Sequence, residues 1–139
     1  MFLQGGEVIL EYPHNKMDLS PRSIGDVLVL APAGRLDHES VDAFRTGLQV
    51  HLDAALEARH SVLFDLSGLE YVSSAGLRCF MLAARQAKAK DGKMAVAAPR
   101  PVVAEIFEIS RFNMVFRIFP TMGEALGFLS PDPAVSGKG

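Results

Sequence analysis

The stretch SVLFDLSGLEYVSSAGLR, residues 61–78, decides the fold. Residues 61–66 are mostly apolar, which predicts a strand buried on both faces. A Ser-Gly pair then marks a loop. Ser73 and Ser74 open an apolar, alanine-rich helix that is predicted over residues 75–90. A buried strand, a loop and a helix in this order are typical of a sheet whose strands are joined by helices.

The two adjacent serines allow a structural and a functional interpretation. Serine is a leading N-cap residue, so Ser73 and Ser74 are explained as a cap and its neighbour. The same position also holds a hydroxyl at the positive end of the helix dipole, where a phosphate is tolerated. The rest of the chain bears on the choice between the two interpretations.

A hairpin is expected upstream of this stretch. Its arms are Asp18–Ile24 and Val27–Ala31, joined by a turn at Gly25 and Asp26. The second arm is uniformly apolar and is expected at the centre of the sheet. A helix follows from about Ser40, which is a good N-cap. Its buried stripe is predicted at Val41, Phe44, Leu48, Leu52 and Ala55.

Downstream, two further strand–helix units are expected. The strands are Lys93–Ala97 and Val115–Phe119. One helix begins at Pro101, a residue suited to the first helical position. The other is Met122–Leu129, opened by a capping box of Thr at the N-cap and Glu three residues later. The complete order predicts a single α/β domain with a mixed sheet, an N-terminal hairpin followed by parallel strands, and about four helices.

The ends of the chain are less determined. Residues 7–12 are compatible with a short strand, and residues 1–16 are equally compatible with an extension that precedes a compact domain. The domain itself is predicted over residues 17–130. Residues 131–139 are expected to form a flexible tail.

Composition excludes several function classes. The chain has 139 residues, 49% hydrophobic and 22% charged, with a net charge of −2. These values indicate one globular domain and no nucleic-acid partner, since such a partner usually needs a basic surface. No apolar run reaches the ~20 residues of a membrane helix and no secretory signal is recognised, so no membrane insertion and a cytoplasmic location are expected.

Cofactor and metal chemistry is not expected either. The single cysteine, Cys79, lies inside a predicted helix and is expected to be buried. His51 and His60 have no second ligand at metal-binding spacing, and no His/Cys cluster indicates zinc. A hydrolase that uses Ser74 is disfavoured, because the chain has neither a Gly-x-Ser-x-Gly elbow nor a Walker loop.

Several motifs together resemble the STAS domains, the bacterial anti-sigma-factor antagonists. Residues 34–37, Gly-Arg-Leu-Asp, resemble the family's Gly-x-Leu-Asp turn, and residues 65–77 are similar to its phosphorylation segment. The resemblance continues through residues 101–112 and 124–129. It implies a binding module and kinase substrate rather than an enzyme. The implied partners are an anti-sigma factor with serine kinase activity, whose capture releases a sigma factor, and a PP2C-type phosphatase.

The resemblance also implies site residues. The family's phosphoacceptor lies two residues before a Gly-Leu pair, which here is Ser74, with Ser73 as second choice. Ser73 stands where many relatives have Asp, and Arg111 stands where relatives often have Gly, so a helix end lacks its easiest left-handed residue. The partner-binding residues expected from the motifs are Gly34, Leu36, Asp37, Ser73, Ser74, Ala75, Gly76, Leu77 and Arg78.

The predicted sheet gives this site a geometric test. Ligands and partners of open α/β sheets tend to meet the carboxyl ends of the strands. Loops 34–40 and 67–75 are therefore expected on one edge, with Ser74 exposed and level with Asp37. The alternative within the same fold is a STAS module that does not switch and serves as a scaffold in a lipid-transport or sensor complex.

Overall fold

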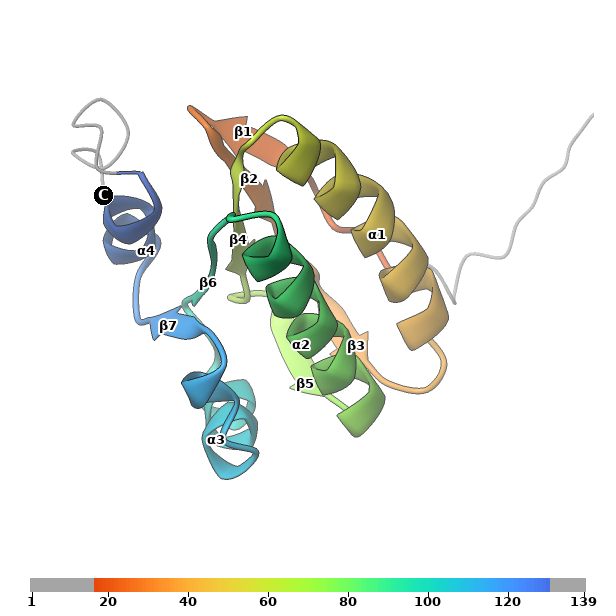
Figure 1. The fold of residues 1–139 in the computed structure, drawn as a ribbon. Helices are drawn as coiled ribbons and strands as arrows, with labels where there is room; N and C mark the ends of the chain where they lie inside the picture. Colours follow the sequence, from red (N-terminus) through yellow and green to blue (C-terminus); the bar gives the residue numbers. More distant parts are fainter. Residues whose placement is uncertain (1–16, 131–139) are drawn as a thin grey trace, which may run out of the picture.

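The computed structural model describes residues 17–130. Its main sheet has five strands in the order β1-β2-β4-β6-β7 (Figure 1). β1 pairs antiparallel with β2, and the other pairs are parallel. The strands are β1 (Arg22–Ile24), β2 (Val27–Leu30), β4 (Ser61–Asp65), β6 (Met94–Ala97) and β7 (Arg117–Phe119). This arrangement confirms the predicted mixed sheet with its N-terminal hairpin. The expected strand at 7–12 and the expected tail at 131–139 lie outside the described residues.

A second, two-stranded sheet was not predicted. β3 (Gly34–Leu36) pairs in parallel with β5 (Leu69–Val72), where the sequence predicts loops. Both strands are too short for a period of two to be recognisable, and they are brought together from distant parts of the chain. Gly34 starts the pairing at a φ of +89°, a value that glycine adopts at low cost, and its N–H donates to the carbonyl of Gly68 at 2.9 Å.

Helices cover both faces of the main sheet. α1 (Val41–Glu57) and α2 (Ser74–Ala89) lie side by side on one face, and α4 (Met122–Leu129) covers the other (Figure 1). Strand alternation explains the division. In β4, Val62 and Phe64 belong to the core under α1 and α2, whereas Leu63 packs in the cluster that contains α4. α3 (Pro101–Ile109) packs against β5 and is followed by a 3₁₀ turn, η3 (Phe112–Met114).

Phenylalanine rings fill the larger core. The ring of Phe80 lies 5.4 Å from that of Phe44, 5.0 Å from that of Phe64 and 5.9 Å from that of Phe107, measured between centroids. Such tilted and edge-on pairs add to the free energy of simple burial. All five residues of the predicted α1 stripe are buried, as helical periodicity requires.

Most helix ends follow the predicted chemistry. Pro101 occupies the start of α3, and the N–H of Glu124 donates to Oγ1 of Thr121 at 3.2 Å. Arg111, two residues beyond the end of α3, has a φ of +61°, so a bulky residue holds a left-handed position at a cost of roughly 1 kcal/mol. Because η3 occupies the next turn, β7 begins at Arg117 instead of the predicted Val115.

Candidate functional site

The β3–β5 pair places two of the predicted loops next to each other. Leu36 is opposite Val72 in the parallel register, and the N–H of Ser73 donates to the carbonyl of Leu36 at 2.8 Å. Asp37 and Ser73 therefore directly follow the ends of two adjacent strands. We call residues 34–40 and 73–78 together the rim, which lies at the lower right of the ribbon in Figure 1. The expectation that both loops share one edge is confirmed.

The two serines of the rim differ in what their hydroxyls do. Ser73 is the N-cap of α2, and its Oγ accepts from the N–H of Gly76 at 3.2 Å. Ser74 is the first helical residue, is exposed, and has no side-chain hydrogen bond to another residue of 17–130. The capping role therefore belongs to Ser73, and the Ser74 hydroxyl is accessible.

Gly76 fixes how α2 begins. A Cβ at this position would lie 2.7 Å from Cγ of Leu36 and 2.9 Å from Cγ2 of Val72. Real Cβ contacts are essentially never this short, so the helix start approaches β3 and β5 as closely as only glycine allows. This contact fixes the first turn of α2 and holds Ser74 on the side facing solvent.

Asp37 is an oriented carboxylate on the same rim. The N–H of Glu39 donates to Oδ1 of Asp37 at 3.0 Å, and this bond is the main reason that the pKa of Asp37 is lowered. Arg35 contributes less, with its Nε 3.8 Å from Oδ2 and its guanidinium 4.4 Å from the ring centre of Tyr71. Asp37 is consequently ionised at neutral pH and adds negative charge beside α2.

Ser40 has a different role from the predicted one. It occupies the N-cap position of α1, but its side chain makes no cap hydrogen bond. Its Oγ instead donates to the carbonyl of Arg35 at 2.7 Å and accepts from the N–H of Asp37 at 3.0 Å. The hydroxyl is thus satisfied within the turn that precedes the helix and braces the segment that carries Asp37.

The nine predicted partner-binding residues fall into three levels of exposure. Ser74, Ala75 and Arg78 are exposed, and Gly34, Asp37 and Ser73 are half-buried. The side chains of Leu36 and Leu77 are buried, as is Gly76. These last three lie beneath the rim, where they support the residues above them.

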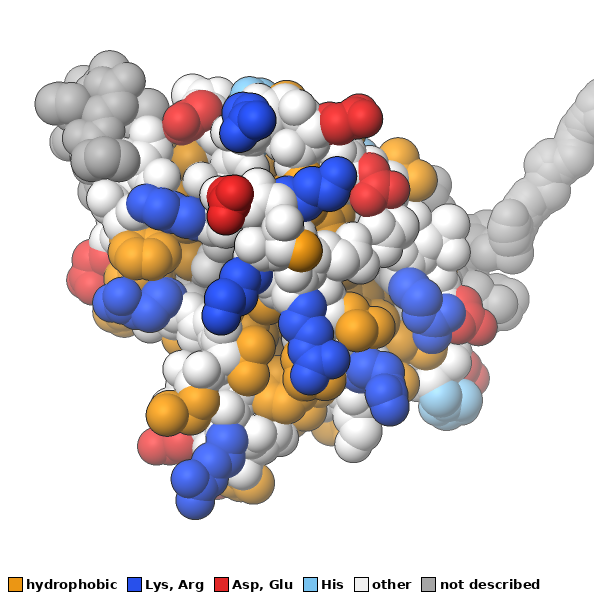
Figure 2. Space-filling view, viewed as in Figure 1, with side chains coloured by type: hydrophobic (Ala, Val, Ile, Leu, Met, Phe, Trp, Pro, Cys, Tyr) orange, Lys and Arg blue, Asp and Glu red, His pale blue; other side chains and the backbone are white. Residues whose placement is uncertain are grey.

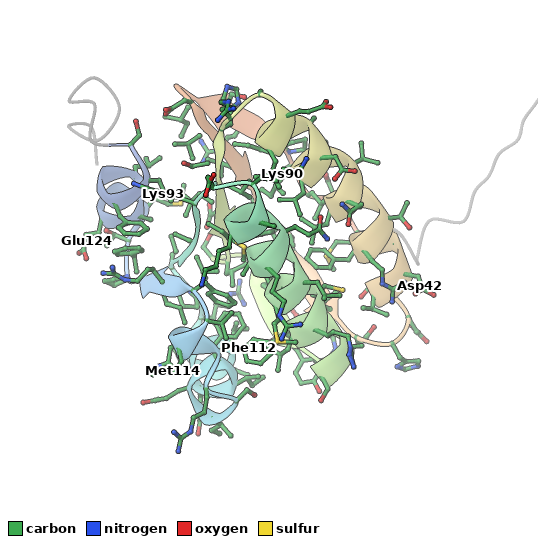
Figure 3. All side chains as sticks on the ribbon, in the orientation of Figure 1. Asp42, Lys90, Lys93, Phe112, Met114 and Glu124 are labelled. Atoms are coloured by element: carbon green, nitrogen blue, oxygen red, sulfur yellow. The ribbon has the colours of Figure 1, made fainter. Side chains whose placement is uncertain are left out.

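A groove borders Ser74 on the side of α3. It has a volume of about 430 Å³ and is lined by Ser74, Ala75, Leu77, Arg78, Met81, Ser110 and Phe112. Figure 3 shows Phe112 and Met114 projecting from η3, the 3₁₀ turn after α3. Met114 is 79% exposed and is not among the residues that line the groove. No local signal in the sequence marks the lining from Met81, Ser110 and Phe112 as one surface.

Other site chemistries find no support in residues 17–130. Within them, no three His, Cys, Asp or Glu side chains are grouped as metal ligands would be. Cys79 is buried as predicted, and burial raises the pKa of its thiol. Nor does that part of the chain contain a helix with the length and apolar character needed to cross a bilayer.

Comparisons with known proteins agree on one family. The family model of the STAS domain matches residues 18–125. BtrV of Bordetella bronchiseptica, named as a candidate anti-sigma factor antagonist, is 30% identical over 102 residues, which cover 73% of this chain and 85% of BtrV.

Solved structures show the same fold. An anti-sigma factor antagonist from Mycobacterium paratuberculosis has a TM-score of 0.71 and 20% identity, covering 86% of this chain and 98% of its own. The anti-sigma factor antagonist SpoIIAA in its unphosphorylated form has a TM-score of 0.65 and 19% identity, with coverage of 81% and 96%. The phosphorylated form of SpoIIAA from Bacillus matches with a TM-score of 0.58 and 19% identity, with coverage of 78% and 96%.

Proposed function

The chain belongs to the STAS domain family of anti-sigma factor antagonists, and we propose that it binds an anti-sigma factor through the rim and thereby releases a sigma factor in the cytoplasm. The exposed hydroxyl of Ser74, at the start of α2 and beside the Asp37 segment, is the observation that carries this proposal. Binding of a partner, not catalysis, is the activity.

Phosphorylation of Ser74 would switch this binding. The Ser74 Oγ attacks the γ-phosphorus of ATP, the bond to the β-phosphate bridging oxygen breaks, ADP leaves, and the hydroxyl proton passes to a base of the kinase. The kinase is the anti-sigma factor itself. A PP2C-type phosphatase reverses the step, because water attacks the phosphorus and inorganic phosphate leaves with the Ser74 hydroxyl restored.

The expected effect on binding is large. A phosphoserine carries about −1.5 to −2 charges at neutral pH. A partner packed on the rim would have to accommodate this charge without water, next to the carboxylate of Asp37. Like charges brought together in an interface cost several kcal/mol, and each ~1.4 kcal/mol is a factor of ten in affinity. We expect phosphorylation to weaken binding by about a hundredfold.

Exposure and hydrogen bonding support Ser74 over Ser73 as the acceptor. The hydroxyl of Ser73 is half-buried and engaged by the N–H of Gly76, whereas that of Ser74 is exposed. A kinase needs the acceptor oxygen to be accessible and its lone pairs unengaged. SpoIIAA, which shares the fold, is known in an unphosphorylated and a phosphorylated form.

Mass spectrometry after incubation with the cognate anti-sigma kinase and ATP tests the assignment. We expect one phosphate on Ser74, lost in Ser74→Ala and retained in Ser73→Ala. A phosphate on another residue would reject Ser74. If the anti-sigma factor binds the chain with equal affinity before and after phosphate transfer, the switch is wrong, and the scaffold role predicted as the alternative is favoured.

A further inference from the structure

The exposed side of α2 carries charge of one sign. Arg78, Arg85 and Lys88 are exposed, and residues 74–89 include no Asp or Glu. Figure 2 shows Lys and Arg side chains along this helix, with apolar side chains between them. Of these three basic residues, only Arg78 lines the groove that also contains Ser74.

The helix places Arg78 within reach of Ser74. The two residues are four positions apart on α2, a spacing that brings their Cβ atoms within about 5–6 Å of each other. Side chains of a helix lean toward its N-terminus, and the Arg78 side chain is long enough to reach the turn that carries Ser74; both residues line the same groove. Within residues 17–130, Arg78 takes part in neither of the ion pairs present, Arg35–Asp37 and Arg45–Asp42.

We propose that Arg78 binds the phosphate of phosphorylated Ser74 within the same helix. This rests on the proposed function, in which Ser74 is the acceptor. The planar guanidinium matches two phosphate oxygens at once, and such charge-assisted hydrogen bonds are roughly twice as strong as neutral ones. Phosphorylation then changes the rim twice, because it adds negative charge at Ser74 and also withdraws the positive charge of Arg78 from a docking partner.

Other charged groups near the rim define the controls. The Asp37 carboxylate, with its neighbour Arg35, leaves the strand end next to Ser73, and both act equally on every variant of α2. Arg111 is the competing cation, because it lies between the groove residues Ser110 and Phe112. Arg85 is a matched control on α2, exposed and eleven residues beyond Ser74.

The test uses the full chain with phosphoserine inserted at position 74 during translation, so that no kinase is needed. The second pKa of a phosphoserine lies near 6 and is followed by ³¹P NMR as a function of pH. A neighbouring guanidinium favours the dianion, so Arg78→Gln is expected to raise this pKa by about 0.1 to 0.4 pH units. Arg85→Gln and Arg111→Gln are expected to change it by less than half as much.

Equal shifts in Arg78→Gln and Arg85→Gln, or a larger shift in Arg111→Gln, would overturn the proposal. Circular dichroism establishes that each variant is folded. Arg78→Lys, which keeps the charge without the planar fork, serves if the glutamine variant is unfolded, and an unchanged pKa in a folded Arg78→Lys would contradict bidentate binding. Since the phosphate is inserted without a kinase, a failure here leaves Ser74 as a kinase substrate, and a failure of the kinase assay leaves this measurement valid.

Discussion

The two helices that begin on the rim start with the same residue type and use it in opposite ways. Ser40 and Ser73 both occupy N-cap positions, directly after strands or turns of the β3–β5 pair. Ser40 is buried, and its hydroxyl bonds to the preceding turn. Ser73 caps its own helix, and the residue after it, Ser74, is exposed.

The length of the connection explains the difference. β5 ends at Val72, so a single residue joins it to α2, and the serine there is free to cap. β3 ends at Leu36, and the four residues 37–40 must turn before α1 begins. Two backbone groups at this turn are part-buried, the carbonyl of Arg35 and the N–H of Asp37, and the hydroxyl of Ser40 bonds to both of them. The serine at the start of α1 is therefore a buried support, whereas the start of α2 leaves the Ser74 hydroxyl exposed to solvent.

The largest expected effect comes from disturbing the close contact between the first turn of α2 and strands β3 and β5. In Gly76→Ala, the added methyl group overlaps Leu36 and Val72, so we expect the free energy of unfolding to fall by about 1–3 kcal/mol. Urea denaturation measures this. Ala75→Ser is the control at the exposed neighbouring position, with an expected change within about 0.5 kcal/mol. An unchanged stability of Gly76→Ala would mean that α2 does not depend on this contact.

An intermediate effect compares the serine hydroxyls at the starts of α1 and α2 by their contribution to stability. Ser40→Ala leaves the carbonyl of Arg35 and the N–H of Asp37 without their partner, and is expected to cost about 1–2 kcal/mol. Ser74→Ala removes an exposed hydroxyl and is expected to stay within about 0.5 kcal/mol. Both are measured by urea denaturation of the unphosphorylated chain. Equal losses of unfolding free energy in the two variants would mean that the hydroxyls of Ser40 and Ser74 do not differ in structural role.

The smallest expected effect is a pH dependence of folding stability that arises from Asp37, in the turn before α1. The pKa of Asp37 is lowered in the folded chain, chiefly by the N–H of Glu39, so its ionisation stabilises the fold above the unfolded pKa of about 4. This contribution is lost as the pH falls through the lower, folded pKa. Asp37→Asn keeps an acceptor oxygen without the charge, so its Tm difference from the native chain should shrink between about pH 5 and about pH 2.

Scanning calorimetry across this pH range measures the difference. Ser74→Ala, which removes no titrating group, should differ from the native chain by a constant Tm across the same range. A Tm difference for Asp37→Asn that widens toward low pH would show that the ionised carboxylate does not stabilise the turn.

Local patterns were sufficient for most of the fold. The stripe of Val41, Phe44 and Leu48 repeats at helical spacing, and burial follows from that spacing alone. The apolar run of β4 and the capping sequence at Thr121 were likewise readable from neighbouring residues. The proximity of loops 34–40 and 67–75 was predicted from the carboxyl ends of two strands, and the pairing of β3 with β5 brings these two segments together. Ser74 as phosphoacceptor stays a prediction.

The sequence by itself determined the order of the helices and of the five strands of the main sheet, and the position of a serine pair at a helix start, because these depend on interactions between residues close in the chain. Only the tertiary structure decided that β3 pairs with β5, that Ser40 turns away from its helix, and that Met81 and Phe112 form one groove. Each of these three features depends on how the folded chain brings groups together, which local helix and strand propensities do not specify. Exposure, which separates Ser74 from Ser73 and Ser40, is a property of the packed chain.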